Sequence, residues 1–438
     1  MNPIPKPKKN PSVENMRPII LLNSVRKIFS MITLKRIEDK IDEYTGPSQQ
    51  GYKREEGCAD IVWCQKILTS VLKRKKWRFH KMSIDMSRAF DTIKRSVIIN
   101  LLRDAGCSED DIRLVKSLVT DTKLSIKIRK TVSGEFETTL GSFQGDCLSG
   151  KLFTLYLAGC INHMRAVLGT KRPMSHINDH QMPIEMAYVD DVDFIDENKD
   201  TLQEMLGVVH TVFQKWNLKV NTGKTEFTDF YISNEKEQRG NEDWRKTTTL
   251  GSKICSIKDI EHRISLSNIA FKKLTQIWTK KTTLMLETKL KVYKAMITPI
   301  LLYNCCTWAA PKYIMEKVEA CQRNHLRILL KIRFPEVINN DELYKRTNMK
   351  PLKDQIDSRR WRMLGKILRQ DENKPAQNAL MFAISNPTNL RARKGRPQIN
   401  LLDELKKDAK QKGMKLESIE DILELRTKAK NEVLWNQS

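Results

Sequence analysis

The spacing of apolar residues changes once along the chain, and this change constrains the fold more than any other feature. Before about Ile260, short apolar runs with strand-like alternation stand among stretches with helical spacing. After that point apolar residues recur at helical spacing only, beside faces rich in Lys and Arg. We therefore predict an α+β fold in which an antiparallel sheet with helices is followed by a helical region.

The charge of the chain limits the class of partner. The sequence carries 78 Lys and Arg against 53 Asp and Glu, a net charge of +25, and residues 271–370 hold 22 basic against 8 acidic residues. This excess indicates a polyanion, with nucleic acid ahead of an anionic membrane surface. No apolar run reaches the roughly 20 residues of a membrane span, and the N-terminus lacks the apolar stretch of a secretory signal. We expect an intracellular protein, of the nucleus or cytoplasm, without stable membrane association.

The first part of the chain divides into short elements. Residues 1–15 form a basic leader that is kept extended by Pro3, Pro5, Pro7 and Pro11. Helical spacing predicts helices at 25–44, 59–72, 97–105, 110–119, 152–168 and 202–216. Alternation predicts strands at 81–87, 225–232 and 250–257, and hairpins at 184–196 and at 123–140, the latter turning at Ser133–Gly134.

Three acidic residues stand out within these strands. Asp85 lies on the polar face of its strand, and the doublet Asp190–Asp191 interrupts the apolar hairpin at 184–196. A tight turn at the doublet lets both carboxylates approach an acid on a neighbouring strand, where they repel each other unless a divalent cation neutralises them. Oxygen-only ligation suits Mg²⁺ that also holds phosphates. Taken alone, the doublet also fits a solvated turn, and Asp85 fits a helix N-cap or an ion pair.

Seven sequence blocks carry a resemblance to a known family. In order they are RPIILLN (Arg17–Asn23), QQGYKREEGCAD (Gln49–Asp60), SIDMSRAFDTI (Ser83–Ile93), GSFQGDCLSGKLF (Gly141–Phe153), AYVDDVDF (Ala187–Phe194), LKVNTGKTEF (Leu218–Phe227) and LGSKI (Leu250–Ile254). They resemble the ordered blocks of the reverse transcriptases of non-LTR retrotransposons of the long-interspersed-element type. The resemblance implies an RNA-directed DNA polymerase with the right-hand fold. It places the fingers and palm at 16–257, a helical thumb at 258–335, a basic helical region at 336–384, a basic linker at 385–398 and C-terminal helices at 399–438.

The resemblance also implies a mechanism. Asp85, Asp190 and Asp191 correspond to the catalytic acids that ligate two Mg²⁺ ions, for which Mn²⁺ is a substitute, and the Met86 carbonyl corresponds to a further ligand. One ion activates the primer 3′-hydroxyl, and the other holds the triphosphate of the incoming nucleotide. The implied partners are therefore a template RNA, a primer DNA and dNTPs.

Further residues correspond to binding positions of the family. Phe90 stands where the family places an aromatic gate against the 2′-hydroxyl, Gln144 and Gly145 line the nucleotide and template side, and Lys224 approaches the triphosphate. Phe90 also fits a core position, and Lys224 fits a solvated strand start. Phosphate contacts are expected of Arg17 and of the cluster Lys73, Arg74, Lys75 and Lys76, which also fits a solvated loop.

The chain departs from the family pattern in two respects. Cys147 and Gly150 replace the usual prolines of their block, and Gly150 loosens the start of the helix there. No block resembling an endonuclease precedes the polymerase blocks, so we expect a product that lacks its own nuclease. A catalytically decayed or domesticated copy that only binds nucleic acid is therefore an alternative, and a group II intron-like lineage is a third.

The Cys and Trp residues of the helical part are expected in its core. Cysteines and a histidine lie there on apolar segments without the spacing of a zinc finger, and the tryptophans have core spacing. The residues in question are Cys305, Cys306, Cys321, His325, Trp278, Trp308 and Trp361.

Overall fold

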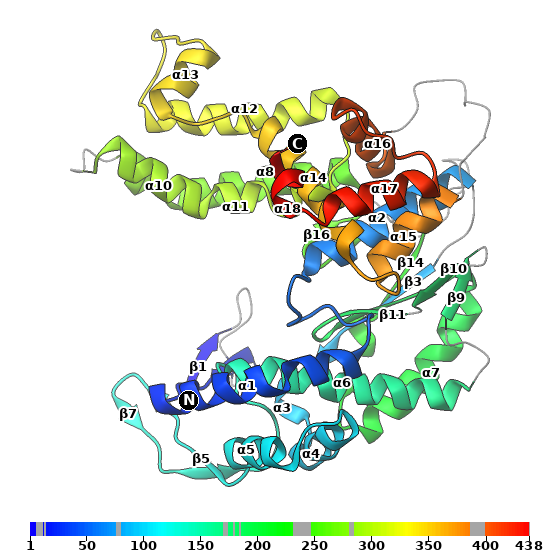
Figure 1. The fold of residues 1–438 in the computed structure, drawn as a ribbon. Helices are drawn as coiled ribbons and strands as arrows, with labels where there is room; N and C mark the ends of the chain where they lie inside the picture. The colour runs from blue at the N-terminus through cyan, green and yellow to red at the C-terminus, as the bar shows by residue number, and fades with distance from the viewer. Residues whose placement is uncertain are drawn as a thin grey trace. The chain divides into compact units, whose positions relative to one another are not determined.

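The structure is a computed structural model of the chain, and it describes residues 1–5, 12, 15–75, 80–169, 174–177, 180–183, 185–230, 247–279, 284–385 and 399–437. The α+β class is confirmed, because helices alternate with small antiparallel sheets (Figure 1). The chain divides into two compact units. Unit 1 comprises Met1–Cys58 and Phe79–Phe227, and unit 2 comprises Ala59–Arg78 and Thr228–Ser438. None of the helices in the described ranges is both long and apolar enough to cross a membrane.

The main sheet contains four strands in the order β11 (Glu185–Tyr188), β12 (Asp191–Asp196), β3 (His80–Ile84) and β14 (Glu226–Asp229). Strand β12 pairs antiparallel with both β11 and β3, so the hairpin predicted at 184–196 is confirmed. Alternation decides which face is buried. Val192 and Phe194 of β12 lie opposite Ile84 and Met82 of β3, and all four enter the hydrophobic core. The intervening residues of both strands carry the polar groups of the opposite face.

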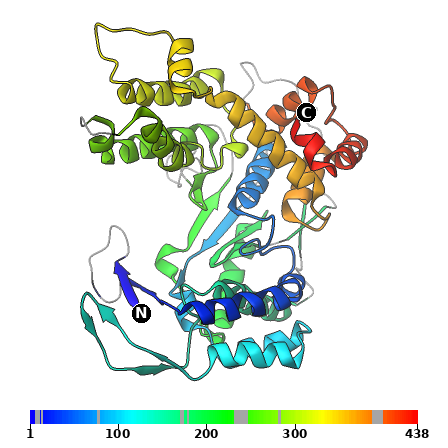
Figure 2. The same cartoon turned by 60° about the vertical axis from the view of Figure 1, so that its left-hand side comes forward.

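Helices pack around this sheet and enclose the core of unit 1. They are α1 (Ser24–Thr45), α3 (Ala89–Thr92), α4 (Arg95–Asp104), α5 (Glu109–Val119), α6 (Cys147–Leu168) and α7 (Lys199–Lys215). The buried helix α6 contacts α1, α4 and α7, and α7 also packs on β3 and β12. Figure 2 shows α1, in blue, running beside α5, in cyan. The helices predicted in this part of the chain are confirmed within a few residues at their ends.

The remaining strands of unit 1 are short. They are β1 (Asn2–Pro5), β2 (Met16–Ile19), β4 (Met86–Ser87), β5 (Thr122–Leu124), β6 (Lys127–Ile128), β7 (Thr131–Val132), β8 (Phe136–Thr138), β9 (Met174–Ile177), β10 (His180–Pro183) and β13 (Lys219–Val220). Strand β1 pairs with β2, which confirms that the start of the leader is extended. Most of residues 6–14 lie outside the described residues.

The hairpin predicted at 123–140 forms, but the turn predicted at Ser133–Gly134 is wrong. Strand β6 pairs with β7, with Ile128 opposite Thr131, so the turn lies at Arg129–Lys130. Arg129 supplies the left-handed backbone with a φ of 55°. Ser133 lies on the returning arm, where its backbone N–H donates to Ile126 O at 2.9 Å and its hydroxyl accepts from Ile126 N at 2.9 Å. Here the strand pairing overrides the turn preference of a Ser-Gly pair.

Unit 2 is mainly helical, which confirms the change of periodicity near residue 260. It contains α2 (Cys58–Lys75, of which Cys58 belongs to unit 1), β15 (Thr248–Thr249), β16 (Ser252–Lys253), α8 (Ser256–Lys273), α9 (Thr275–Thr279), α10 (Leu286–Met296), α11 (Thr298–Leu301), the 3₁₀ turn η4 (Cys305–Thr307), α12 (Lys312–Leu329), α13 (Asn340–Thr347), α14 (Leu352–Arg369), α15 (Pro375–Ser385), α16 (Leu401–Gln411), α17 (Ile419–Ala429) and α18 (Glu432–Gln437). The linker predicted at 385–398 lies outside the described residues, apart from Ser385.

The strand predicted at 250–257 is wrong in its extent. Leu250 and Gly251 have φ values of 47° and 76°, and they form the tight turn between β15 and β16. Helix α8 then begins at Ser256. The carboxylate of Asp259 in its first turn accepts a hydrogen bond from the backbone N–H of Lys253 at 2.9 Å, which supports an early helix start.

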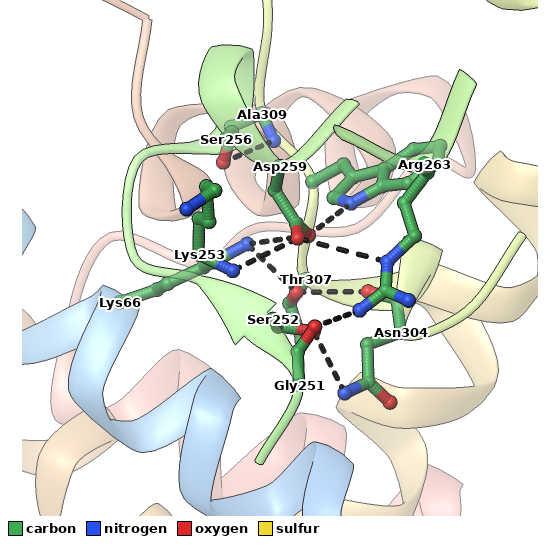
Figure 3. A network of polar contacts seen from close by, with 11 residues as sticks. Lys66, Gly251, Ser252, Lys253, Ser256, Asp259, Arg263, Asn304, Thr307 and Ala309 are labelled. Atoms are coloured by element: carbon green, nitrogen blue, oxygen red, sulfur yellow. Dashed lines mark hydrogen bonds and ion pairs between the residues drawn. The ribbon is translucent and has the colours of Figure 1, made fainter. Parts of the chain in front are cut away.

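A buried polar network surrounds Asp259 in unit 2 (Figure 3). The Asp259 carboxylate accepts a hydrogen bond from Trp308 Nε1 at 2.8 Å and lies 3.7 Å from Lys66 Nζ of α2. Lys66 Nζ also donates to Thr307 Oγ1 at 3.0 Å. Burial lowers the pKa of Lys66, and the Asp259 carboxylate opposes that shift by stabilising the charged ammonium. The network therefore joins α2, α8 and the segment at η4, and its charges depend on one another.

The tryptophans and most of the cysteines predicted in the core are buried. Trp278, Trp308 and Trp361 are buried, and Trp361 stacks on Trp435 with 4.2 Å between ring centroids. Cys305 and Cys321 are also buried, whereas Cys306 is half-buried. Among the described residues no group of three His, Cys, Asp or Glu side chains stands ready-arranged around a metal position, and Cys305, Cys306, Cys321 and His325 form no such group.

His325 of α12 makes the stability of the folded protein depend on pH. Its ring stacks on Phe271 with 4.0 Å between centroids, its Nε2 lies 2.8 Å from Asn268 Oδ1, and its Nδ1 lies 3.2 Å from the Tyr293 hydroxyl. These partners fit a neutral ring in which Nε2–H donates to Asn268 and Nδ1 accepts from Tyr293. Burial lowers the pKa of His325 to about 4.

We expect the free energy of unfolding to fall as the pH drops from about 6.5 to about 4. The unfolded histidine takes up a proton near pH 6.5 and the folded one does not, so the contribution of His325 is complete above that range. The loss amounts to about 3 kcal/mol at pH 4. Urea unfolding between pH 7 and pH 4, compared with the His325→Phe variant, measures it. An unchanged pH slope in the variant would contradict the assignment.

Candidate active site

Strand register brings two of the predicted acids to the same end and face of the main sheet. The last printed pair between β12 and β3 is Val192 opposite Ile84, so the next positions, Asp191 and Asp85, stand level across the two strands. On the same face Asp193 accepts a hydrogen bond from the Ser83 hydroxyl at 2.6 Å, and Lys81 lies 3.3 Å from Asp193. Directly opposed side chains on one face are typically about 5 Å apart at Cβ.

The third acid, Asp190, lies in the turn between β11 and β12. The pair Tyr188 opposite Asp191 leaves Val189 and Asp190 as the two turn residues. The sequence predicts a tight turn at the doublet, and the structure places it one residue earlier, so that Asp191 is the first residue of β12. The turn thus directs Asp190 toward the end of the sheet where Asp85 and Asp191 stand.

Electrostatics show that the three carboxyl groups affect one another. Burial raises the pKa of Asp191 to about 6, and repulsion from Asp190, Asp193 and Asp85 adds to the shift. Burial also raises the pKa of Asp190, with a further contribution from Asp85, whereas Arg17 lowers it. Repulsion from neighbouring acids thus adds to the effect of burial at both Asp190 and Asp191.

Lys224 partly compensates this charge. Its Nζ lies 2.7 Å from Asp85 Oδ2, and both side chains reach solvent. Lys224 belongs to the 3₁₀ turn η2 (Thr222–Lys224), which follows β13, and β13 pairs with β4 immediately after Asp85. Asn221 N–H donates to the Asp85 carbonyl at 2.8 Å and ties the two segments together. The amino group thus stands where a cation would contact the Asp85 carboxylate.

The arrangement fits divalent cations in its chemistry. In the described ranges no three carboxyl, imidazole or thiol groups already stand as ligands of one ion, and the Asp85 carboxylate is hydrogen-bonded to Lys224. The donor set is nevertheless entirely carboxylate oxygen, and burial, with added repulsion from neighbouring acids, raises the pKa of both Asp190 and Asp191. Hard cations such as Mg²⁺ bind such oxygen-only sets.

The other residues predicted to bind the nucleotide also belong to unit 1. Met86 is buried in β4, and Phe90 of α3 is half-buried, stacking on Phe153 of α6 with 4.3 Å between centroids. Gln144 Nε2 donates to Asp91 Oδ1 at 3.2 Å, and the Gln144 carbonyl accepts from Ile20 N–H at 2.8 Å. The segment before α6 is therefore held against both α3 and the chain that follows β2.

Gly145 cannot be replaced at this place without a shift of the backbone. Its φ is 121°, and an added Cβ would lie 2.7 Å from the Ile20 carbonyl oxygen. Only glycine combines this backbone conformation with such a close approach. The prediction that Gly145 allows close backbone contact is consistent with this geometry.

The predicted phosphate-binding residues are placed only in part. Arg17 is exposed on β2 and is near enough to Asp190 to lower its pKa. The side chains of Lys73, Arg74, Lys75 and Lys76 lie outside the described part of the structure. Their role stays a prediction.

The structure adds two residues that the sequence did not single out, Gln49 and Tyr52. Asp190 contributes to a raised pKa of Tyr52, after burial. The Tyr52 ring fills the space over Gly150, where an added Cβ would lie 2.4 Å from ring atoms. Helix α6 nevertheless begins at Cys147 with Asp146 as its N-cap, so Gly150 accommodates Tyr52 in a formed helix. The sequence signal for both residues was their place in the block Gln49–Asp60.

Comparison with known proteins gives one family and several distant relatives. The family model described as reverse transcriptase (RNA-dependent DNA polymerase) matches residues 4–254. A retrovirus-related Pol polyprotein from the type-1 retrotransposable element R2 of Popillia japonica is 26% identical over 220 residues, 50% of this chain and 30% of that protein. A probable RNA-directed DNA polymerase from transposon BS of Drosophila melanogaster is 22% identical over 374 residues, 80% of this chain and 40% of that protein. The chain therefore spans less than half the length of these relatives.

Among solved structures, the chain resembles apo telomerase from Candida tropicalis. The sequence identity is 14% and the TM-score is 0.44, over 94% of this chain and 61% of the telomerase chain.

Proposed function

Because the chain belongs to the reverse transcriptase (RNA-dependent DNA polymerase) family, we propose that it copies a template RNA by adding dNTPs to the 3′ end of a primer DNA. Its relatives from retrotransposable elements confirm the resemblance to non-LTR reverse transcriptases. The observation that supports the proposal best is the position of Asp85, Asp190 and Asp191 at one end of the main sheet. Three carboxylates from two neighbouring segments suit a reaction that moves phosphoryl groups with divalent metals.

The residues proposed to hold the metal are Asp85, Asp190 and Asp191, with the Met86 carbonyl as a further oxygen ligand. These residues would hold two Mg²⁺ ions, or Mn²⁺ in their place, which would supply Lewis acidity to the primer 3′-hydroxyl and to the triphosphate. Divalent cations bound there would compete with the Lys224 ammonium, which now donates to one of the two Asp85 oxygens, and would displace it. Lys224 is then free to approach the triphosphate as a charge or proton donor.

Other residues of the chain bind and orient the substrates in this proposal. Arg17, exposed beside Asp190, adds positive charge on the side where phosphates would lie. Gln144 and Gly145 line the nucleotide and template side, where the backbone lies close to Ile20. The basic helices of unit 2 bind the template–primer duplex by its phosphates, which makes binding fall steeply with salt. In this proposal residues 16–257 are fingers and palm, and residues 258–335 are the thumb.

Phe90 is proposed to exclude the 2′-hydroxyl of a ribonucleotide. Replacement by alanine is expected to lower the preference for dCTP over CTP by about tenfold or more, because the ring no longer occupies the space that the hydroxyl would enter. Single-nucleotide incorporation with each substrate measures this ratio. The control is Phe136→Ala, since Phe136 is exposed on β8. An unchanged ratio in Phe90→Ala, with unchanged folding, would show that Phe90 serves only to pack against Phe153.

The direct test is primer extension by the purified chain on an RNA template. We expect Mg²⁺-dependent extension by the wild-type protein and none by a variant carrying both Asp190→Ala and Asp191→Ala. Primer extension needs no endonuclease, because the primer end is supplied. Salt-dependent RNA binding without incorporation, with Mg²⁺ and with Mn²⁺, would contradict the proposal and favour a copy that only binds nucleic acid. Full activity of the double variant would contradict the assignment of the site.

A further inference from the structure

The turn that carries Asp190 contains a strained residue. Val189 has a φ of 60°, in the left-handed region that β-branched residues rarely adopt. Such a conformation is strained and persists only where surrounding contacts hold it. Val189 lies directly before Asp190 and Asp191, so a change in its backbone would move both carboxylates.

Gln49 makes the contacts that hold this turn. Its Oε1 accepts a hydrogen bond from Val189 N–H at 2.9 Å and another from Gly51 N–H at 2.8 Å, and its Nε2 donates to the Val189 carbonyl at 3.3 Å. The Gln49 side chain is buried, and only 3% of the residue is exposed. Both polar ends of one amide are thus engaged by the backbone of a single strained residue.

The main chain around Gln49 fixes this amide in place. Ala187 of β11 donates its N–H to the Ser48 carbonyl at 2.9 Å, and Gln50 donates its N–H to the Ala187 carbonyl at 2.9 Å. Gly51 lies so close to the turn that an added Cβ would be 2.6 Å from Val189 N. Residues 48–50 therefore form an isolated parallel bridge with β11 at Ala187, and Gly51 meets the turn where β11 ends.

We propose that Gln49 is a positioning residue that holds Val189 in its left-handed conformation and so determines where the carboxyl groups of Asp190 and Asp191 stand. Its effect on polymerisation rests on the proposed function, whereas its effect on the turn does not. Gln49 touches no substrate in this account and acts only through the backbone of Val189. Its loss lets the turn relax and misplaces the acids without removing any ligand.

The first test is kinetic and uses a matched control. Gln49→Met keeps the length of the side chain and removes its hydrogen bonds, and a displacement of about 1 Å at reacting groups can lower a rate about 100-fold. We expect kcat for dNTP addition to fall between about 10-fold and 100-fold, with KM for dNTP and affinity for primer–template within about twofold. The control is Gln50→Met, at a neighbouring buried glutamine whose Oε1 has no hydrogen-bond partner in the described part of the chain. Equal effects of the two substitutions would overturn the proposal.

The second test uses the strain itself. Glycine adopts a positive φ without steric cost. In a Val189→Gly chain the turn can therefore keep its conformation with less support from the hydrogen bonds of Gln49. We expect Gln49→Met to lower kcat by no more than about threefold in the Val189→Gly background. If the factors by which the two substitutions lower kcat simply multiply in the double variant, Gln49 does not act through the conformation of Val189 and the proposal is wrong.

A third measurement separates this inference from the proposed function. Hydrogen exchange of the Val189 amide, followed by NMR with ¹⁵N-valine labelling and without nucleic acid, is expected to be slow in the wild type and at least tenfold faster in Gln49→Met. If the wild-type protein extends no primer, this exchange still decides whether Gln49 holds the turn. Equal exchange in the two proteins would overturn the proposal. Faster exchange with an unchanged kcat in an active enzyme would also overturn it, because the acids would then be positioned without Gln49.

Discussion

The Asp191→Asn variant is expected to lose at least about 1,000-fold in primer extension rate while it still binds primer–template. The substitution keeps the shape of the side chain and removes the charge that a divalent cation requires. Groups that stabilise charge in a transition state typically contribute factors of 10²–10³ each, and a metal ligand contributes at least as much. Single-turnover incorporation at saturating dNTP measures the loss.

The control for this variant is Asp121→Asn, an exposed acid in the same unit. Asp121 has a φ of 50°, a conformation that asparagine tolerates equally well, so the exchange changes charge alone. We expect full activity in the control. An Asp191→Asn protein that keeps more than a tenth of the wild-type rate would place the chemistry elsewhere.

Asp259→Ala is expected to lower the free energy of unfolding more than any other substitution named above. Asp259→Ala leaves the Lys66 ammonium buried without its countercharge, and it removes the acceptor of Trp308 Nε1 and Lys253 N–H. Breaking a buried ion pair by removing one partner costs about 3–5 kcal/mol. Urea unfolding of the full chain measures the free energy of unfolding.

Two further variants show whether the unpaired lysine is the cause. Glu261→Ala removes a partner of the exposed pair with Lys258 on the same helix α8, and it is expected to cost less than about 1 kcal/mol. Adding Lys66→Met to Asp259→Ala is expected to restore part of the stability, because the buried charge is gone. Equal losses in Asp259→Ala and Glu261→Ala would mean that the network in Figure 3 contributes little.

Much of the fold is predictable because burial imposes a period on the sequence. The continuous apolar run of α6 reflects a helix that is buried on all sides over most of its length, and the alternation of β3 and β12 reflects one buried face. The predicted elements are confirmed there. The face that each acid occupies was predictable for the same reason, whereas the pairing of β12 with β3, which brings Asp191 level with Asp85, is a contact between distant segments. Alternation fixes the face that each acid occupies, and the hairpin at β11 and β12 fixes the end of the sheet.

The remaining features depend on contacts between distant segments, which leave no periodic signal. The turn at Arg129–Lys130 follows from strand pairing, and it prevails over the stronger turn preference of Ser133–Gly134. The Lys224–Asp85 pair joins residues 139 positions apart. The Gln49 contacts to Val189 join residues 140 positions apart, and a buried glutamine cannot be told from an exposed one by its sequence neighbours.

The central claim is that Asp85, Asp190 and Asp191 together hold two divalent cations. Anomalous scattering from a crystal of the protein with Mn²⁺, primer–template and a non-hydrolysable dNTP analogue tests it most directly. We expect two manganese peaks, each within about 2.5 Å of at least one of these carboxylates, with Lys224 no longer bonded to Asp85. Manganese bound to the nucleotide but not to any of the three acids would contradict the account.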